Sequence, residues 1–301
     1  MKVLIYGAGG VGGFIGSFLE KTDFDISYVV RNRRFEFLKS NGLILKSNIE
    51  NLEKKNLKLF KKINKGESFD IIIVTVKLYD FDEVFNEIID KVKGDFIILP
   101  MQNGIYAEEK ISETLGLDNT YGAVAQISAH VDSNQTVQHI GKLATFFVGN
   151  YGTKESHTLK FFCEKVQEKN LSIIFKQNIK EKIWEKFIFL SAYSGITTMT
   201  QKTIGEIYNN SELKNKFNDA MKETFNLSRK FGVDFKRDPI EFWNDKIKKM
   251  PAEMTSSMYY DFLENKKLEL DWLSGSIVEL GKRKGINCET HTEIVKKIKL
   301  R

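Results

Sequence analysis

The chain of 301 residues has little cysteine, little proline and no long apolar run. Its two cysteines, Cys163 and Cys288, form no CxxC pair, which argues against a disulfide framework and a thiolate metal site. The longest apolar runs, such as IIIVTV and FIILPM, are strand-length, whereas a bilayer-spanning helix needs about 20 apolar residues. Three prolines argue against long disordered linkers. We expect a globular, cytoplasmic protein with no membrane partner.

Histidine is equally scarce. The four histidines show no HxxxH spacing, so we expect no metal site; they are His130, His139, His157 and His291. We interpret all four as surface imidazoles, and the two cysteines as small buried hydrophobic residues.

Positive charge is only slightly in excess, with 46 Lys+Arg against 40 Asp+Glu and a net charge of +6. The lysines alternate with acidic residues, as in ENKKLELD, instead of gathering with aromatic residues. This pattern does not indicate a nucleic-acid partner. A modest excess of this kind suits a small anionic ligand, such as a phosphorylated cofactor or a carboxylate substrate.

Glycine is concentrated near the N-terminus, in MKVLIYGAGGVGGFIGSFLE. A signal peptide is not indicated, because the glycines interrupt the apolar run and the charged stretch EKTDFD follows. The pattern predicts a strand that turns into a helix, with a GxGxxG motif at the turn. This motif lets backbone N–H groups approach a pyrophosphate at the helix N-terminus. We assign cofactor binding to Gly7, Gly9, Gly10, Val11 and Gly12, with an ordinary glycine-rich turn as the alternative.

The end of the next strand, DISYVVR, indicates which dinucleotide binds. An NAD site places Asp or Glu there to bind the ribose 2′-hydroxyl. This chain has Arg31, with Arg33 and Arg34 behind it, and guanidinium donors suit a 2′-phosphate. The predicted cofactor is therefore NADP (NADPH), and the alternative is a solvated basic loop.

Further βα patterns follow. FDIIIVTVK and DFIILPMQN are apolar strands that end near Lys77 and Asn103, where ligands of parallel sheets bind. Alternating residues from Thr120 suggest antiparallel or edge strands. From Gln177 only helical patterns remain. We predict an α/β Rossmann-type dinucleotide-binding domain over 1–176 and an all-α substrate and catalytic domain over 177–301.

The first helix of the second domain, around IWEKFIFLSAYS, contains Lys186 within an apolar stripe. Leu190 and Ser194 follow it by four and eight residues on the same face. By position alone, such a lysine is typical of a side chain that extends to solvent.

Several short motifs follow one another along the chain. They are GxGxxG, Arg31, VK at Val76–Lys77, QNG at Gln102–Gly104, WEK at Trp184–Lys186, SSM at Ser256–Met258, and ELD before Gly275. The set resembles the ketopantoate reductase (2-dehydropantoate 2-reductase) family from residue 1 to about residue 285. The resemblance implies an NADPH-dependent oxidoreductase of pantothenate biosynthesis. Such an enzyme reduces a branched 2-keto carboxylate, ketopantoate, to pantoate.

The resemblance also implies roles for five residues. Lys186 corresponds to the general acid, and Glu269 to the carboxylate that pairs with it and takes a substrate hydroxyl. Asn103 corresponds to the residue that bridges substrate and nicotinamide ribose. Lys77 would lie near the cofactor, and Ser257 would bind the substrate carboxylate. Taken singly, Glu269 suits a surface salt bridge and Asn103 suits a turn. Lys77 suits a strand-end cation, and Ser257 suits a helix cap.

The chain departs from the family pattern at two substrate-binding positions. Leu190 and Ser194 stand where the family has asparagines. The departure leaves a different 2-keto acid open as substrate, because unpaired buried polar groups penalise a ligand. An oxidoreductase of opines or hydroxy acids, or a non-catalytic NADP sensor, would also fit the cofactor motifs. The aromatic stretch MYYDFLENKKLELDWL suits either core or the surface of a homodimer.

Overall fold

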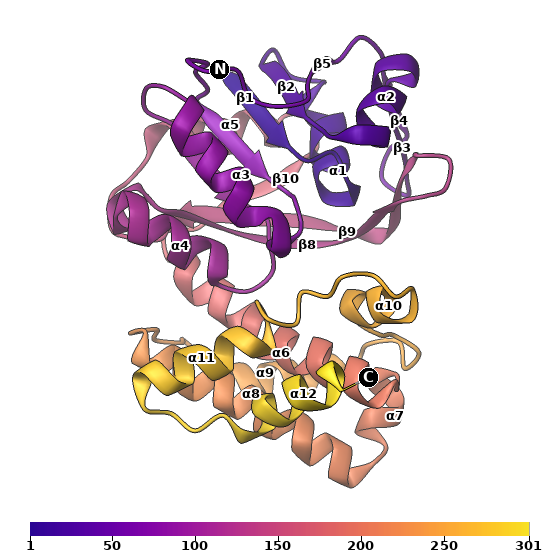
Figure 1. The fold of residues 1–301 in the computed structure, drawn as a ribbon, viewed down its shortest axis with the longest axis vertical. Coiled ribbons are helices and arrows are strands. Elements are labelled where there is room, and N and C mark those ends of the chain that lie inside the picture. Colours follow the sequence, from indigo (N-terminus) through magenta and orange to yellow (C-terminus); the bar gives the residue numbers. More distant parts are fainter. Residues whose placement is uncertain (301) are drawn as a thin grey trace. The chain divides into compact units, whose positions relative to one another are not determined.

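The computed structural model describes residues 1–300, which form two compact units (Figure 1). One unit contains Met1–Gln102 and Ala107–Ile179, and the other contains Asn103–Tyr106 and the chain from Lys180 onward. The predicted fold class is confirmed, because the first unit has a parallel sheet with helices and the second is helical. The domain boundary after residue 176 stays a prediction.

The first unit is built on five parallel strands in the order β5-β2-β1-β6-β7. These strands are β1 (Lys2–Tyr6), β2 (Asp25–Val29), β5 (Lys58–Phe60), β6 (Ile71–Val74) and β7 (Ile97–Pro100). Helices α1 (Gly10–Leu19), α2 (Asn32–Asn41), α3 (Leu78–Lys91) and α4 (Tyr106–Leu115) follow β1, β2, β6 and β7 in the chain. The runs VLIY and IIIV are fully buried, as in parallel strands covered on both faces.

A second sheet has the order β10-β9-β3-β4, with β8 paired to β9. Its strands are β3 (Leu43–Ser47), β4 (Leu52–Lys54), β8 (Tyr121–Val131), β9 (Val137–Asn150) and β10 (Ser172–Phe175). The antiparallel pairing of β8 with β9 confirms the strands predicted from the alternating residues after Thr120. The short helix η1 (Leu117–Asn119) precedes β8, and α5 (His157–Gln167) precedes β10.

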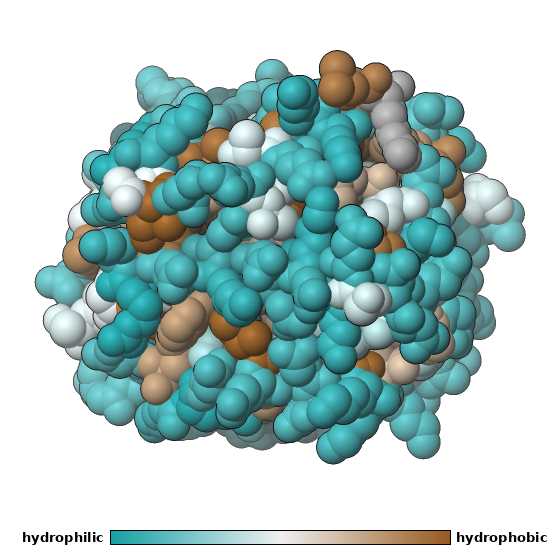
Figure 2. Space-filling model, turned by 90° about the horizontal axis from the view of Figure 1, so that it is seen from below, coloured by the Kyte–Doolittle hydropathy of each residue, from teal (hydrophilic) through white to brown (hydrophobic). Residues whose placement is uncertain are grey.

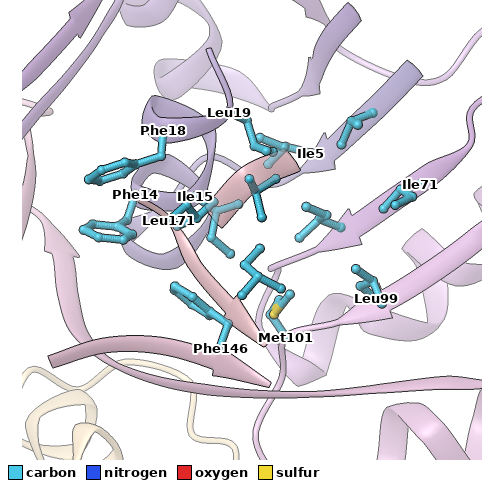
Figure 3. Close-up of a cluster of buried hydrophobic side chains, with 14 of the residues drawn as sticks. Ile5, Phe14, Ile15, Phe18, Leu19, Ile71, Leu99, Met101, Phe146 and Leu171 are labelled. Carbon is cyan, nitrogen blue, oxygen red and sulfur yellow. The ribbon is translucent and has the colours of Figure 1, made fainter. Parts of the chain in front are cut away.

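Helix α1 packs against β1 of the parallel sheet and against β3, β8 and β9 of the second sheet. Figure 3 shows Phe14 and Phe18 of this helix among the buried side chains, with Phe146 of β9 and Ile5 of β1 in the same cluster. The rings of Phe14 and Phe146 lie 6.2 Å apart. The side chains of α1 therefore pack against both sheets and form part of the hydrophobic core.

The second unit is a set of helices (Figure 1). Trp184 and Phe187 of its first helix are buried, and the rings of Phe189 and Trp243 stack 4.3 Å apart. None of the described helices combines the length and apolarity that crossing a membrane requires. Figure 2 shows one face of the molecule, where hydrophilic side chains dominate and hydrophobic ones form small patches. The helices are α6 (Ile179–Thr200), α7 (Ile204–Tyr208), α8 (Ser211–Lys230), α9 (Pro239–Ile247), α10 (Ser257–Leu263), α11 (Ser274–Lys284) and α12 (Glu289–Lys299).

The cysteine interpretation is confirmed, since Cys163 and Cys288 are both buried and free. The histidine interpretation is wrong for two residues. His139 is buried, with Nδ1 2.8 Å from the Ser47 hydroxyl and Nε2 3.1 Å from the Leu143 carbonyl. His291 is fully buried, and its Nε2 lies 3.0 Å from the Ala220 carbonyl. Local partners for the ring nitrogens make such burial tolerable.

Burial lowers the pKa of His291 to about 4, and its Nδ1 has no hydrogen-bond partner within residues 1–300. Because the pKa is depressed in the folded state, the unfolded chain binds the extra proton between pH 6.5 and about 4. The contribution of neutral His291 to the free energy of unfolding is complete above pH 6.5 and is lost as the pH falls toward 4. The loss amounts to roughly 3 kcal/mol at most. Urea unfolding across this range should show a shallower pH dependence for His291→Gln than for the wild type. The exposed-site control His157→Gln should keep the wild-type slope.

Candidate active site

The glycine loop connects β1 to α1 and presents the helix N-terminus. Gly7 has φ of +99°, and its carbonyl accepts a hydrogen bond from Thr75 Oγ1 at 2.6 Å. Helix α1 has Gly9 as its N-cap, with neither a capping side chain nor an acidic residue in its first turn. A Cβ added at Gly9 would meet nothing within 4 Å. The loop therefore leaves room, and the positive end of a helix, for an anion.

Other glycines of this motif are required by packing. A Cβ at Gly10 would lie 2.2 Å from the Ala129 carbonyl oxygen of β8, and one at Gly12 would lie 2.0 Å from the Gly7 oxygen. Real Cβ atoms essentially never come this close to a backbone atom, so any other residue at these positions would force the backbone to shift. The assignment of Gly10, Val11 and Gly12 to the cofactor stays a prediction.

Arg31 is the N-cap of α2 and is partly exposed. Its Nη2 and Nη1 donate to the Glu83 carboxylate of α3 at 3.2 and 3.4 Å. Sequence patterns did not indicate Glu83, because the contact joins two helices that lie far apart in the chain. Arg34, which the sequence groups with Arg31, donates instead to the backbone carbonyls of Ala8 and Gln135.

The carboxyl edge of the parallel sheet is tied together by a glutamine for which the sequence predicted no separate role. Gln102 follows β7, and its Nε2 donates to the carbonyls of Val74 and Val76 at 3.2 and 2.9 Å. Lys77 begins α3 as its N-cap at this same edge. The side chain of Gln102 thus fixes the segment that leads from β6 to Lys77.

Asn103, the next residue, belongs to the helical unit. The Lys186 ammonium donates to Asn103 Oδ1 at 2.8 Å. Gly104 has φ of +92°, which lets the backbone turn, and a Cβ there would contact the ring of Phe187 at 3.4 Å. Two residues that the resemblance assigns to one site, 83 positions apart, are therefore joined by a hydrogen bond.

The other predicted substrate residues lie in the same helical unit. Glu269 is buried, and its backbone carbonyl accepts from the N–H of Leu273 at 3.0 Å before α11. Ser257 is exposed at the start of α10, whereas Ser256 is its buried cap. Leu190 is half-buried and Ser194 is buried on α6. These roles stay predictions.

Family models match both parts of the sequence. "Ketopantoate reductase PanE/ApbA" matches residues 3–152, and "Ketopantoate reductase PanE/ApbA C terminal" matches residues 178–301. The chain belongs to the ketopantoate reductase family. Its relatives in this family are oxidoreductases, and the resemblance stated from the motifs is confirmed.

Two relatives show how far the similarity extends. The chain is 28% identical over 286 residues to the uncharacterised oxidoreductase YkpB of Bacillus subtilis, covering 94% of this chain and 93% of the relative. It is 29% identical over 282 residues to the 2-dehydropantoate 2-reductase of Pyrococcus horikoshii, covering 94% and 91%. The similarity spans both units.

Solved structures share the fold at low identity. The 2-dehydropantoate 2-reductase of Geobacter metallireducens has a TM-score of 0.89 at 20% identity, with 100% of this chain and 99% of that chain covered. D-mandelate dehydrogenase with NADH and anilino(oxo)acetate has a TM-score of 0.88 at 21% identity, covering 100% and 97%. The dimeric ketopantoate reductase of Staphylococcus aureus has a TM-score of 0.80 at 19% identity, covering 100% and 98%.

The glycine loop offers a matched pair of substitutions. Gly12→Ala should lower the free energy of unfolding by about 2 kcal/mol or more, because the new methyl group would overlap the Gly7 carbonyl. Gly9→Ala should stay within about 0.5 kcal/mol of the wild type, since its φ of −78° is ordinary and its surroundings are open. Urea unfolding of both variants checks this, and an equal loss in the two would contradict the packing explanation.

Proposed function

We propose that this chain catalyses the NADPH-dependent reduction of a branched 2-keto acid, with 2-dehydropantoate (ketopantoate) to pantoate as the first candidate. The hydrogen bond between Lys186 and Asn103 is the observation that carries the proposal. It gives the ammonium a fixed partner in a family of oxidoreductases, several of whose relatives are named 2-dehydropantoate 2-reductase.

The cofactor would be held at the glycine loop. The first N–H groups of α1 have no intrahelical acceptor, and Gly9 leaves space beside them for a pyrophosphate. Gly7, Gly10, Val11 and Gly12 shape the same turn. Lys77, at the carboxyl edge of the sheet, would add positive charge near the cofactor.

NADPH, when bound, supplies the hydride that reduces the keto carbon. Lys186 donates a proton to the carbonyl oxygen as its negative charge develops, so that the product carries a hydroxyl. Asn103 accepts one of the three ammonium N–H bonds and so limits the directions of the other two. Glu269 would pair with Lys186 and accept a substrate hydroxyl, and Ser257 would donate to the substrate carboxylate.

The preference for NADPH rests on Arg31. Its guanidinium pairs with Glu83, whose side chain is 65% exposed. Because exposed ion pairs contribute about 0 to 1 kcal/mol, a 2′-phosphate can displace Glu83 at little cost. NADH remains the alternative cofactor, since the similar D-mandelate dehydrogenase structure contains it.

A less polar 2-keto acid is a second candidate substrate. Leu190 lies one helical turn after Lys186 and offers an apolar surface without hydrogen-bonding groups. The similar D-mandelate dehydrogenase was solved with the aromatic ligand anilino(oxo)acetate. Ser194, one further turn on, is buried and is the polar position on this face besides Lys186.

A homodimer is the proposed assembly. Tyr260 and Leu263 of α10 are more than half exposed, which favours a partner surface over core for this part of the aromatic stretch. The ketopantoate reductase of Staphylococcus aureus, which shares the fold, is dimeric.

Consumption of NADPH by the purified protein tests the function. The panel should contain ketopantoate, an alkyl 2-keto acid and an aryl 2-keto acid. Lys186→Ala should lower kcat by about 100-fold or more, because the proton donor is lost, and should leave the Kd for NADPH unchanged. The exposed Lys222→Ala serves as control. A wild-type protein that reduces no member of the panel, or a Lys186→Ala variant with normal kcat, would refute the proposal.

Cofactor preference is tested on both partners of the ion pair. Arg31→Gln should raise the Kd for NADPH by about tenfold or more, because a charge-assisted contact to phosphate is lost, while the Kd for NADH changes little. Glu83→Gln should lower the Kd for NADPH a few-fold. Asp90→Asn removes the same charge from α3 and controls for net charge. Equal effects of Arg31→Gln on NADPH and NADH would contradict a 2′-phosphate contact.

A further inference from the structure

Arg34 joins two loops of the first unit through one guanidinium. Its Nε donates to the carbonyl of Ala8 at 2.8 Å, and its Nη1 donates to the carbonyl of Gln135. Ala8 lies between the first two glycines of the GxGxxG motif. Gln135 lies in the turn between β8 and β9 and has φ of +62°.

The turn that Arg34 contacts has side-chain hydrogen bonds of its own. The turn that contains Gln135 is closed by Asp132, whose carboxylate accepts from the N–H of Thr136 at 2.9 Å and from Gln138 Nε2 at 2.8 Å. Arg34 itself is half-buried, and this burial lowers its pKa to about 10 while the Asp132 charge opposes the shift. At neutral pH the guanidinium therefore stays charged, and its hydrogen bonds are of the stronger, charge-assisted kind.

Holding the Ala8 carbonyl has a direct geometric effect on Gly9. The carbonyl of Ala8 and the N–H of Gly9 belong to one planar trans peptide, so they point in opposite directions. When Arg34 draws the carbonyl toward itself, the Gly9 N–H is directed to the other side of the peptide. The position that a Cβ of residue 9 would occupy is open, with nothing within 4 Å.

Arg34 and Arg31 are three residues apart, but their guanidinium groups contact different partners. The Nη donors of Arg31 face the exposed carboxylate of Glu83, with which an incoming phosphate would compete. Two donor atoms of Arg34 are already used by backbone carbonyls.

We propose that Arg34 is a positioning residue, which aims the Gly9 N–H at the pyrophosphate of the dinucleotide by holding the Ala8 carbonyl. The inference rests on the proposed function, since it requires a dinucleotide at the glycine loop. NADPH and NADH share the pyrophosphate, so Arg34 should serve both equally. Arg31 should serve only the 2′-phosphate.

Calorimetric titration of NADPH and of NADH into the purified protein tests the proposal. Arg34→Gln should raise both Kd values by the same factor, about tenfold, because the Gly9 N–H is no longer aimed and its hydrogen bond to the charged pyrophosphate is lost. Arg34→Lys should give a smaller, equally shared rise, because an ammonium keeps the charge but lacks the planar fork that spans two carbonyls. It also serves where Arg34→Gln does not fold. Lys39→Gln, which removes a charge from the exposed end of α2, should leave both values unchanged.

The ratio of the two Kd values decides the outcome. A rise confined to NADPH would make Arg34 a 2′-phosphate ligand and overturn the proposal. Unchanged Kd values with a lower melting temperature would reduce Arg34 to a purely structural role. A wild-type protein that binds neither nucleotide would refute both the proposed function and this inference. If it binds both but reduces no 2-keto acid, only the proposed reaction fails, and the Kd ratio still decides the role of Arg34.

Discussion

The close approach of α1 to the two sheets is the constraint on which the first unit depends. Gly12 lies against the backbone of the β1 turn, Gly10 against β8, and Gly13 against Val137 of β9. Any side chain at these positions would push the helix away from one sheet. The same approach sets the helix N-terminus directly after β1, so packing and the proposed anion binding share one structural cause.

In the helical unit, the proposed chemistry depends on the hydrogen bond between Lys186 and Asn103. Asn103 follows the last strand of the parallel sheet in the chain, yet its contacts group it with the helices. A short segment at the end of a Rossmann sheet thus supplies the partner of the proposed proton donor. Gly104 makes this possible, because its positive φ allows a turn that other residues adopt only with strain.

Much of the fold could be predicted from the sequence. Apolar runs such as IIIVTV and the alternation after Thr120 predicted the parallel and antiparallel strands correctly. Strands β3, β4 and β5 were not predicted, because they are short and their pairing is set by distant partners such as β9 and β2. The buried state of His139 and His291 was not predicted either, since burial of a polar ring depends on partners that the local sequence does not contain.

The sequence by itself determined the family and the fold class and predicted the residues of the candidate site, because local periodicity and ordered motifs are properties of the chain alone. Only the tertiary structure decided which donors are already occupied. Arg31 and Arg34 are chemically identical in the sequence, yet one meets an exposed carboxylate and the other meets two backbone carbonyls. The difference arises because a guanidinium's partners come from elements that fold against it, and these lie far away along the chain.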